Sequence, residues 1–110
     1  MLLLRILFFA LPIMMFVLGV PLAMKLVPPN RFYGFRTPTT FSSLTAWYQI
    51  NFATGLALIA AGAVSGAFVF LLSRGMVALK PETCYLIGVL FTAIVTLMFL
   101  LMVVIYSDRF

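Results

Sequence analysis

The feature that most limits the fold of this chain is a long run of residues without charge. Residues 86–105 contain no Asp, Glu, Lys or Arg. A helix of about 20 apolar residues is long enough to cross a hydrocarbon core of about 30 Å, whereas a helix of a soluble domain combines a buried stripe with a polar face. Because this run has no polar face, it predicts a membrane span.

Two further apolar runs, residues 6–24 and 47–72, have the same character. The composition agrees, since 8% of the 110 residues are charged, against about 25% in ordinary soluble domains. We therefore predict an all-α integral membrane protein, with a single three-span domain over residues 1–110. The predicted spans are residues 6–26, 45–72 and 84–106.

The first run contains Pro12 and Pro21. Each proline removes a backbone N–H and clashes with the preceding turn, so we expect a bend in this helix. A cleaved signal peptide is the alternative for this run, but the apolar part of such a peptide is usually about 7 to 15 residues, and no Ala-x-Ala site follows here. A plain polar turn is expected over residues 73–83, between the second and third spans.

Three spans place the cations on two sides of the membrane without a clear excess. One side carries Arg5, Arg74 and Lys80, and the other carries Lys25, Arg31, Arg36 and Arg109. The orientation of such a protein usually follows the excess of Lys and Arg in its loops. Three cations against four leave both orientations open.

The residue types exclude several kinds of site. The chain has no His and one Cys, too few for a metal site of three or four His and Cys ligands. Its two acidic residues, Glu82 and Asp108, lie near different ends of the third run and do not suggest the paired carboxylates of acid/base catalysis. The apolar runs also lack the acidic or basic residue that a pump would need. We expect no enzyme, no metal, no cofactor and no nucleic-acid partner.

The segment between the first two spans is rich in residues that specify backbone turns. Pro28 and Pro29 stop the first helix, Gly34 permits a positive φ, and Thr37 precedes Pro38, which favours extended backbone. This pattern predicts a structured loop rather than a flexible linker.

The same loop leads directly into the second span. Ser42 or Ser43 is a candidate N-cap, because a side-chain oxygen there can accept an otherwise unpaired N–H. The loop thereby brings Arg31 and Arg36 close to a helix N-terminus.

The loop and the start of the second span contain a recognisable signature. Its residues are Asn30, Gly34, Arg36, Thr37, Pro38, Thr40 and Ser42, followed by Trp47, Asn51 and Gly55. This pattern resembles the N…G-x-R-T-P-x-T-x-S…W…N…G signature of the bacterial SdpI family, which also contains the YfhL proteins. With Arg31, these residues are the candidate binding or motif residues.

The resemblance implies a membrane protein whose best-known relatives give immunity to a secreted peptide toxin. Those relatives also relay the presence of the toxin by holding a transcriptional repressor at the membrane. They are longer and carry an additional membrane region, so this chain looks like the motif-bearing part alone.

At 100° per residue, much of the signature in the second span falls on one helical face. That face includes Asn51, Gly55, Gly62 and Gly66. Small residues let helices approach closely in lipid. The face therefore predicts packing against the first and third spans, with a homo-oligomer seam through Gly62 and Gly66 as the alternative. Asn51 is interpreted as a structural clamp on the loop backbone, or alternatively as a ligand group.

The loop arginines have two interpretations. Arg31 and Arg36 could bind an anion beside the helix N-terminus, or they could lie among lipid headgroups or clamp backbone carbonyls. We predict that the Arg36 guanidinium is hydrogen-bonded within the signature. We also predict that Asp108 pairs with Arg31 or Arg36, the alternative being a frayed chain end with Asp108 in water.

The functional expectation is a multi-pass protein of the bacterial cytoplasmic membrane. It would be an immunity or interaction protein that recognises or excludes a membrane-active peptide toxin. The alternative is a lipid-headgroup-binding or transport protein that uses the loop arginines. The expected partners are membrane lipids and a peptide toxin or a protein partner.

Overall fold

The computed structural model describes residues 2–75 and 80–109, and in these ranges it contains three long α-helices and one short 3₁₀ helix. The long helices are α1 (Leu2–Ala23), α2 (Leu44–Ser73) and α3 (Pro81–Ser107), and the short one is η1 (Thr40–Ser42). Each long helix has the length and apolar composition to cross a membrane. The predicted all-α, three-span fold class is confirmed, and the chain is a multi-pass membrane protein.

The observed helices are close to the predicted spans. Helix α1 begins a few residues before residue 6 and ends a few residues before residue 26, the two ends of the predicted span. Helix α3 extends beyond both ends of the predicted span 84–106. Helix α1 runs through Pro12 and Pro21 as one helix, and the bend expected there stays a prediction. The predicted polar turn includes residues 76–79, which lie outside the described residues.

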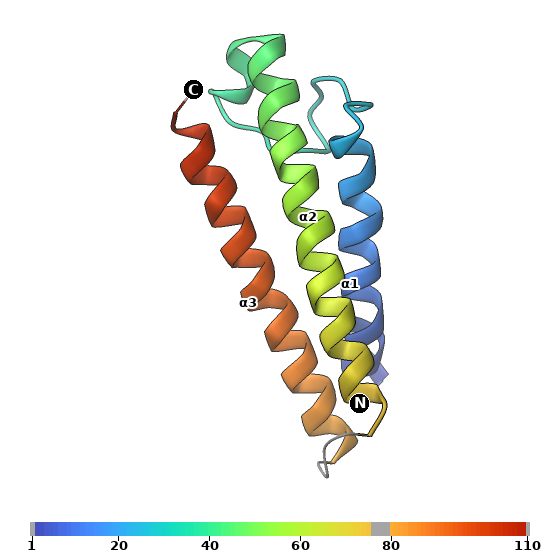
Figure 1. Cartoon of the computed structure of the whole chain (residues 1–110). Coiled ribbons are helices and arrows are strands. Elements are labelled where there is room, and N and C mark those ends of the chain that lie inside the picture. The colour runs from blue at the N-terminus through green and yellow to red at the C-terminus, as the bar shows by residue number, and fades with distance from the viewer. Residues whose placement is uncertain (1, 76–79, 110) are drawn as a thin grey trace.

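The three helices form an elongated bundle with α2 between α1 and α3 (Figure 1). The loop that joins α1 to α2 lies at one end, together with the C-terminal end of α3. The start of α1 and the end of α2 lie at the other end. The bundle measures 51 × 22 × 19 Å, so its length exceeds a hydrocarbon core of about 30 Å and both ends reach the polar interfaces.

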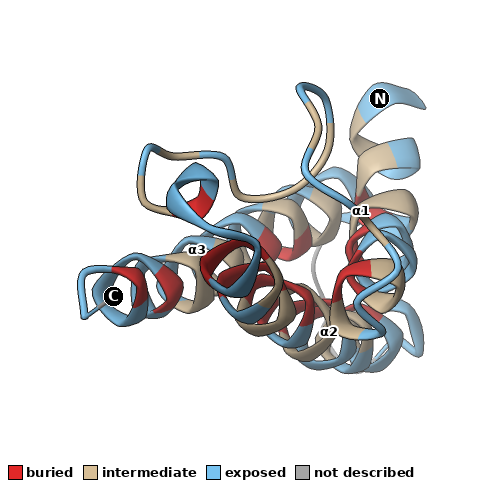
Figure 2. Ribbon diagram, turned by 90° about the horizontal axis from the view of Figure 1, so that it is seen from above, coloured by how far each residue is buried: buried red, intermediate tan, exposed pale blue. Residues whose placement is uncertain are grey.

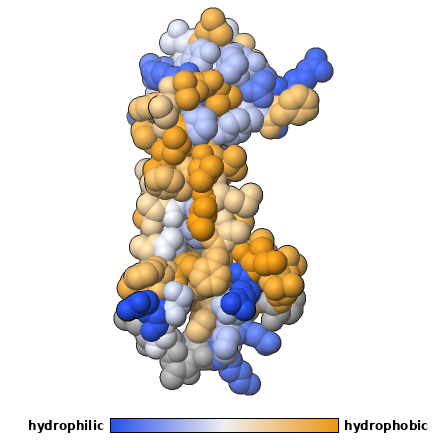
Figure 3. Space-filling view, turned by 90° about the vertical axis from the view of Figure 1, so that its right-hand side faces the viewer, coloured by the Kyte–Doolittle hydropathy of each residue, from blue (hydrophilic) through white to orange (hydrophobic). Residues whose placement is uncertain are grey.

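The surface distribution is that of a protein in lipid. Viewed along the bundle, the buried residues face the space between the helices and the exposed residues face outward (Figure 2). Large apolar side chains such as Ile13, Leu97 and Met102 are exposed on the outside. Hydrophilic residues gather towards the two ends (Figure 3). This arrangement would be unfavourable in water and is expected in a bilayer.

Glycines bring α1 and α2 into direct backbone contact. A Cβ added at Gly55 would lie 2.6 Å from the carbonyl oxygen of Gly19 and would also meet Ala23. A Cβ added at Gly62 would lie 2.8 Å from both the Phe16 nitrogen and the Pro12 oxygen. Contacts this close leave no room for any side chain. The structure therefore uses Gly55 and Gly62 for packing within the chain.

Candidate functional site

The candidate site is the loop between α1 and α2, together with the first turns of α2. The chain leaves α1 through Lys25, whose φ of 59° is left-handed, at a position where helices usually have glycine. Leu26 then donates its N–H to the Pro21 carbonyl at 3.0 Å. The Lys25 ammonium lies 5.4 Å from the centroid of the Phe52 ring, a contact that favours this exit from the helix.

Asn30 organises the first turn of the loop. Its Oδ1 accepts hydrogen bonds from the N–H groups of Phe32 at 2.8 Å and Tyr33 at 2.7 Å. Its Nδ2 donates to the carbonyls of Pro28 at 2.8 Å and Tyr33 at 3.1 Å. An asparagine can take this role because one amide group both accepts and donates. Asn30 is thereby committed to the backbone of the loop itself.

Two aromatic side chains attach the loop to the helices. The Trp47 side chain is fully buried, and its Nε1 donates to the Val27 carbonyl at 2.8 Å. The Tyr33 hydroxyl donates to the Leu18 carbonyl of α1. Burial raises the pKa of Tyr33 above its ordinary value, so the hydroxyl remains a donor further into the alkaline range than a tyrosine in water. The roles of Tyr33 and Val27 could not be predicted from sequence, because nothing in the spacing connects them to their partners.

Asn51 holds the middle of the loop from within α2. Its Oδ1 accepts the Phe35 N–H at 2.6 Å, while its Nδ2 donates to the carbonyls of Phe35 at 3.3 Å and Trp47 at 3.0 Å. Asn51 is only 2% exposed. Asn51 was interpreted either as a clamp on the loop backbone or as a ligand group, and in the structure its side chain is bonded to the loop backbone.

Gly34 is required at the point where the loop meets Asn51. Its φ is 114°, a backbone conformation that residues with a side chain rarely adopt. A Cβ at this position would lie 2.7 Å from Asn51 Oδ1. The glycine and the asparagine of the signature are therefore parts of one contact.

Thr37 and Thr40 close the last turn of the loop reciprocally. The Thr37 N–H donates to Thr40 Oγ1 at 2.8 Å, and the Thr40 N–H donates to Thr37 Oγ1 at 3.2 Å. Thr40 is fully buried, and its hydroxyl also donates to the Thr37 carbonyl at 2.9 Å. Pro38, between them, occupies an exposed position. This pair fixes the chain where it enters η1.

Of the two candidate caps for the second span, Ser43 is the one that caps α2. Its side-chain oxygen accepts the Ala46 N–H at 3.0 Å. Ser42 instead donates its hydroxyl to the Thr39 carbonyl at 2.6 Å. We call the residues that fix the loop the loop clamp. They are Gly34, which fits against Asn51, and the hydrogen-bonded residues Asn30, Tyr33, Thr37, Thr40, Ser43, Trp47 and Asn51.

The Arg36 side chain is exposed, and among the described residues it has no hydrogen-bond partner. The prediction that its guanidinium is bonded within the signature is therefore wrong. Neighbouring carbonyls already have other donors. Asn51 donates to the Phe35 carbonyl, and Thr40 donates to that of Thr37.

The predicted ion pair of Asp108 is also absent. No ion pair joins Asp108 to Arg31 or Arg36 in residues 2–75 and 80–109, and all three side chains are exposed. An exposed carboxylate gains at most about 1 kcal/mol from such a pair. This gain is too small to hold Asp108 against a loop arginine when water solvates both groups.

Outside the loop clamp, the loop has an exposed surface with two cations and an aromatic ring. Arg31 and Arg36 are exposed, and the Phe32 side chain is 89% exposed. The arginines were predicted from sequence as candidate binding residues, but Phe32 was not. An aromatic residue inside a turn-forming segment was the available signal. We call these three residues the loop surface.

The site has no arrangement typical of a metal centre. Within residues 2–75 and 80–109, no three His, Cys, Asp or Glu side chains lie close enough to hold a metal ion.

A surface hollow of 400 Å³ lies beside the loop, and it is lined by Lys25, Leu44, Thr45, Tyr48 and Gln49. The chemistry available here is the binding of an anionic or amphipathic group.

Comparison with known proteins gives one match. A family model described as the SdpI/YfhL protein family matches residues 26–107, which include the loop, α2 and α3. No curated protein and no solved structure matches the chain.

Proposed function

The chain belongs to the SdpI/YfhL protein family, and we propose that it is a non-enzymatic protein of the bacterial cytoplasmic membrane that recognises or excludes a membrane-active peptide toxin. The expected immunity role of the family supplies the class of partner. The loop supplies the surface on which that partner is recognised.

One observation supports the proposal: the side chains of the loop clamp form their hydrogen bonds within this chain, and the loop surface is left uncovered. The side chains of Asn30, Trp47 and Asn51 bond the backbone of this chain. They are therefore positioning residues. The groups left for a partner are Arg31, Phe32 and Arg36, which are exposed at the end of the bundle.

The chemistry of the loop surface suits an amphipathic peptide. Guanidinium groups bind carboxylates through two parallel hydrogen bonds, and aromatic residues and arginines are enriched in protein interfaces. A loop already fixed in one conformation loses little conformational entropy when it binds. A peptide held at the loop surface stays at the membrane interface and is kept from the bilayer core.

The test is protection of a toxin-sensitive bacterium that expresses the chain. We expect wild-type protein to raise survival against at least one membrane-active peptide in a panel, and we expect an Arg31→Gln/Arg36→Gln double variant to lose this protection. Arg74→Gln is the matched control, because Arg74 is an exposed arginine at the other end of the bundle. Equal protection by the double variant and the control would contradict the proposal.

The same exposed guanidiniums favour a second candidate function, binding of an anionic lipid headgroup at the loop. Arg31 and Arg36 have no carboxylate partner in residues 2–75 and 80–109, and cations beside a membrane attract anionic headgroups. This function predicts lipid that stays bound through purification and is lost in Arg36→Ala. Retention of that lipid by the variant would contradict it.

A further inference from the structure

An apolar groove lies between α2 and α3 on the membrane-facing side of the bundle. It has a volume of 310 Å³, at the lower end of the range of about 300 to 1,000 Å³ for ligand pockets. Its lining includes Ala53, Ala57 and Ala60 of α2, and Phe99 and Met102 of α3. The three alanines of α2 leave space beside larger lining residues, which also include Leu56 of α2 and Tyr106 of α3, and this space is the groove.

The groove continues towards a cation at the interface. A second hollow is lined by Met102, Ile105, Tyr106 and Arg109, and it shares Met102 and Tyr106 with the groove. Arg109 follows the last turn of α3 and is exposed. The two hollows together form an apolar path that ends beside a positive charge.

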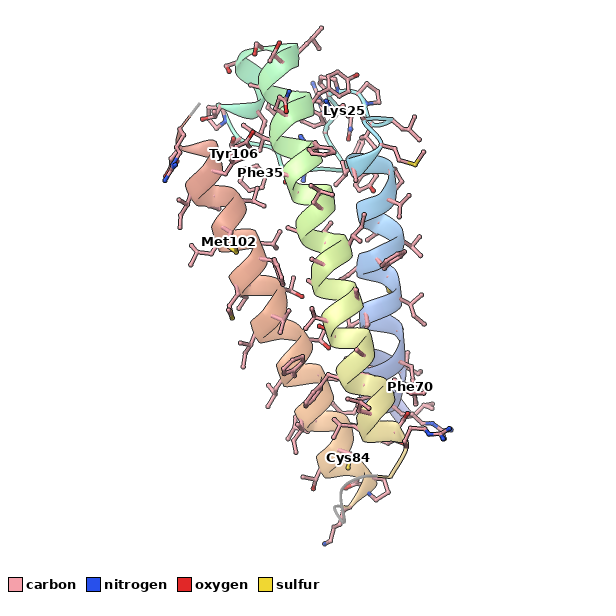
Figure 4. All side chains as sticks on the ribbon, viewed as in Figure 1. Lys25, Phe35, Phe70, Cys84, Met102 and Tyr106 are labelled. Carbon is pink, nitrogen blue, oxygen red and sulfur yellow. The ribbon has the colours of Figure 1, made fainter. Side chains whose placement is uncertain are left out.

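This path lies at the loop-bearing end of the bundle. Figure 4 shows Phe35 of the loop and Tyr106 of α3 at that end, with Met102 further along α3 towards the middle of the bundle. Phe35 packs against a cluster that includes Ala57 and Val103, and both of these residues also line the groove. Asn51 holds the Phe35 backbone, so the loop clamp is connected to the groove through this core cluster.

We propose that the groove binds one acyl chain of an anionic phospholipid, whose headgroup lies beside Arg109. A chain in the groove would cover an apolar surface that already faces the bilayer. Arg109 provides the complementary charge at the depth where headgroups lie, and a single Lys or Arg near the surface adds about 1 kcal/mol to the attraction of anionic lipid. This site is separate from the loop surface and does not depend on the proposed peptide recognition.

The charge of this end of the bundle also favours lipid over a second copy of the chain. The described residues at this end include the cations Lys25, Arg31, Arg36 and Arg109, against the single acidic residue Asp108. Copies in one membrane share an orientation, so a two-fold contact along α2 and α3 would place these positive ends together. An anionic lipid instead neutralises part of this charge.

Native mass spectrometry of the purified chain can test the site with phosphatidylglycerol and phosphatidylcholine of identical acyl chains. The groove variant is Ala60→Phe, which places a bulky ring among the lining residues. Its control is Ala63→Phe, because Ala63 is exposed on the same helix and is not part of the groove lining. The charge variant is Arg109→Gln, and its control is Arg74→Gln, because Arg74 is exposed and lines neither hollow. Arg31→Gln is measured beside them as the variant that reports on the loop surface.

We expect the wild-type chain to bind phosphatidylglycerol more tightly than phosphatidylcholine. Arg109→Gln should weaken phosphatidylglycerol about fivefold and leave phosphatidylcholine unchanged. Ala60→Phe should weaken both lipids, whereas both controls should behave as wild type. Because Arg109 is exposed, its variant should fold even if Ala60→Phe does not.

Three results would overturn the proposal. The first is equal lipid binding by Ala60→Phe and Ala63→Phe. The second is a loss of phosphatidylglycerol in Arg31→Gln but not in Arg109→Gln, which would place the headgroup at the loop. The third is a wild-type dimer that Ala60→Phe abolishes, which would assign the groove to a second copy.

Discussion

The loop clamp makes a quantitative prediction at Asn51. Replacing Asn51 with Ala removes its hydrogen bonds to the Phe35 N–H and to the Phe35 and Trp47 carbonyls. The Trp47 carbonyl lies inside α2 and can keep its helical partner, so the loss concerns the two backbone groups of Phe35. At about 1 kcal/mol for each bond, the closed loop should lose about 2 kcal/mol relative to the open loop.

That loss can be measured by limited trypsin digestion in detergent. When a loop opens and closes faster than it is cut, the cleavage rate follows the population of the open form. A loss of about 2 kcal/mol raises that population about 30-fold. We therefore expect Asn51→Ala to increase cleavage after Arg31 and Arg36 about 30-fold, while cleavage after Arg74, at the other end of the bundle, stays unchanged and serves as an internal reference.

Gln49→Ala is the matched control for this experiment. Gln49 is an amide on the same helix but is exposed, and a surface substitution of this kind usually changes stability by less than about 0.5 kcal/mol. If Asn51→Ala and Gln49→Ala were cut at rates within about twofold of each other, Asn51 would not hold the loop.

Two further predictions concern helix packing and capping. Gly62→Ala should destabilise the bundle by about 1 to 3 kcal/mol, because its Cβ has no room against α1. Gly66→Ala should be neutral, since its Cβ would lie 3.8 Å from the nearest side-chain atom. Similar melting temperatures of the two variants in detergent would refute this prediction. Ser43→Ala should cost about 1 kcal/mol by removing the cap of α2, and Ser42→Ala should cost less. A larger loss in Ser42→Ala, measured in the same assay, would reverse that assignment.

The spans could be predicted from sequence because their signal is local. A run such as residues 86–105 has one physical explanation, since an uncharged stretch of this length has no stable place in water. The cap at Ser43 could also be predicted, because the oxygen of an N-cap residue and the N–H that donates to it lie within one turn. Element type and helix ends follow from neighbouring residues.

The contacts of the loop clamp could not be predicted, because they join residues far apart in the chain. Asn51 was identified as a clamp on the loop, but the spacing does not say that its partner is Phe35. The bond from Trp47 to Val27 spans a similar separation. We predicted a hydrogen bond from Arg36 within the signature because a guanidinium group can donate to backbone carbonyls. In the structure, the uncharged side chains of Asn51 and Thr40 donate to the neighbouring carbonyls instead.

The face of α2 that carries Gly62 illustrates a related limit. The helical period placed Gly62 on a face of close approach. A period cannot say which helix approaches, since an α-helix of another copy would need the same small residues. The structure places α1 there.

The proposed function requires the loop clamp to present Arg31, Phe32 and Arg36 to a membrane-active peptide. The most direct measurement is photo-crosslinking in cells that the protein protects, with the crosslinker at position 32 and a control at position 70, where Phe70 is also exposed but lies at the other end of the bundle. We expect a peptide adduct from position 32, none from position 70, and loss of the adduct in Asn51→Ala. Protected cells without an adduct at position 32, or with equal adducts at both positions, would contradict it.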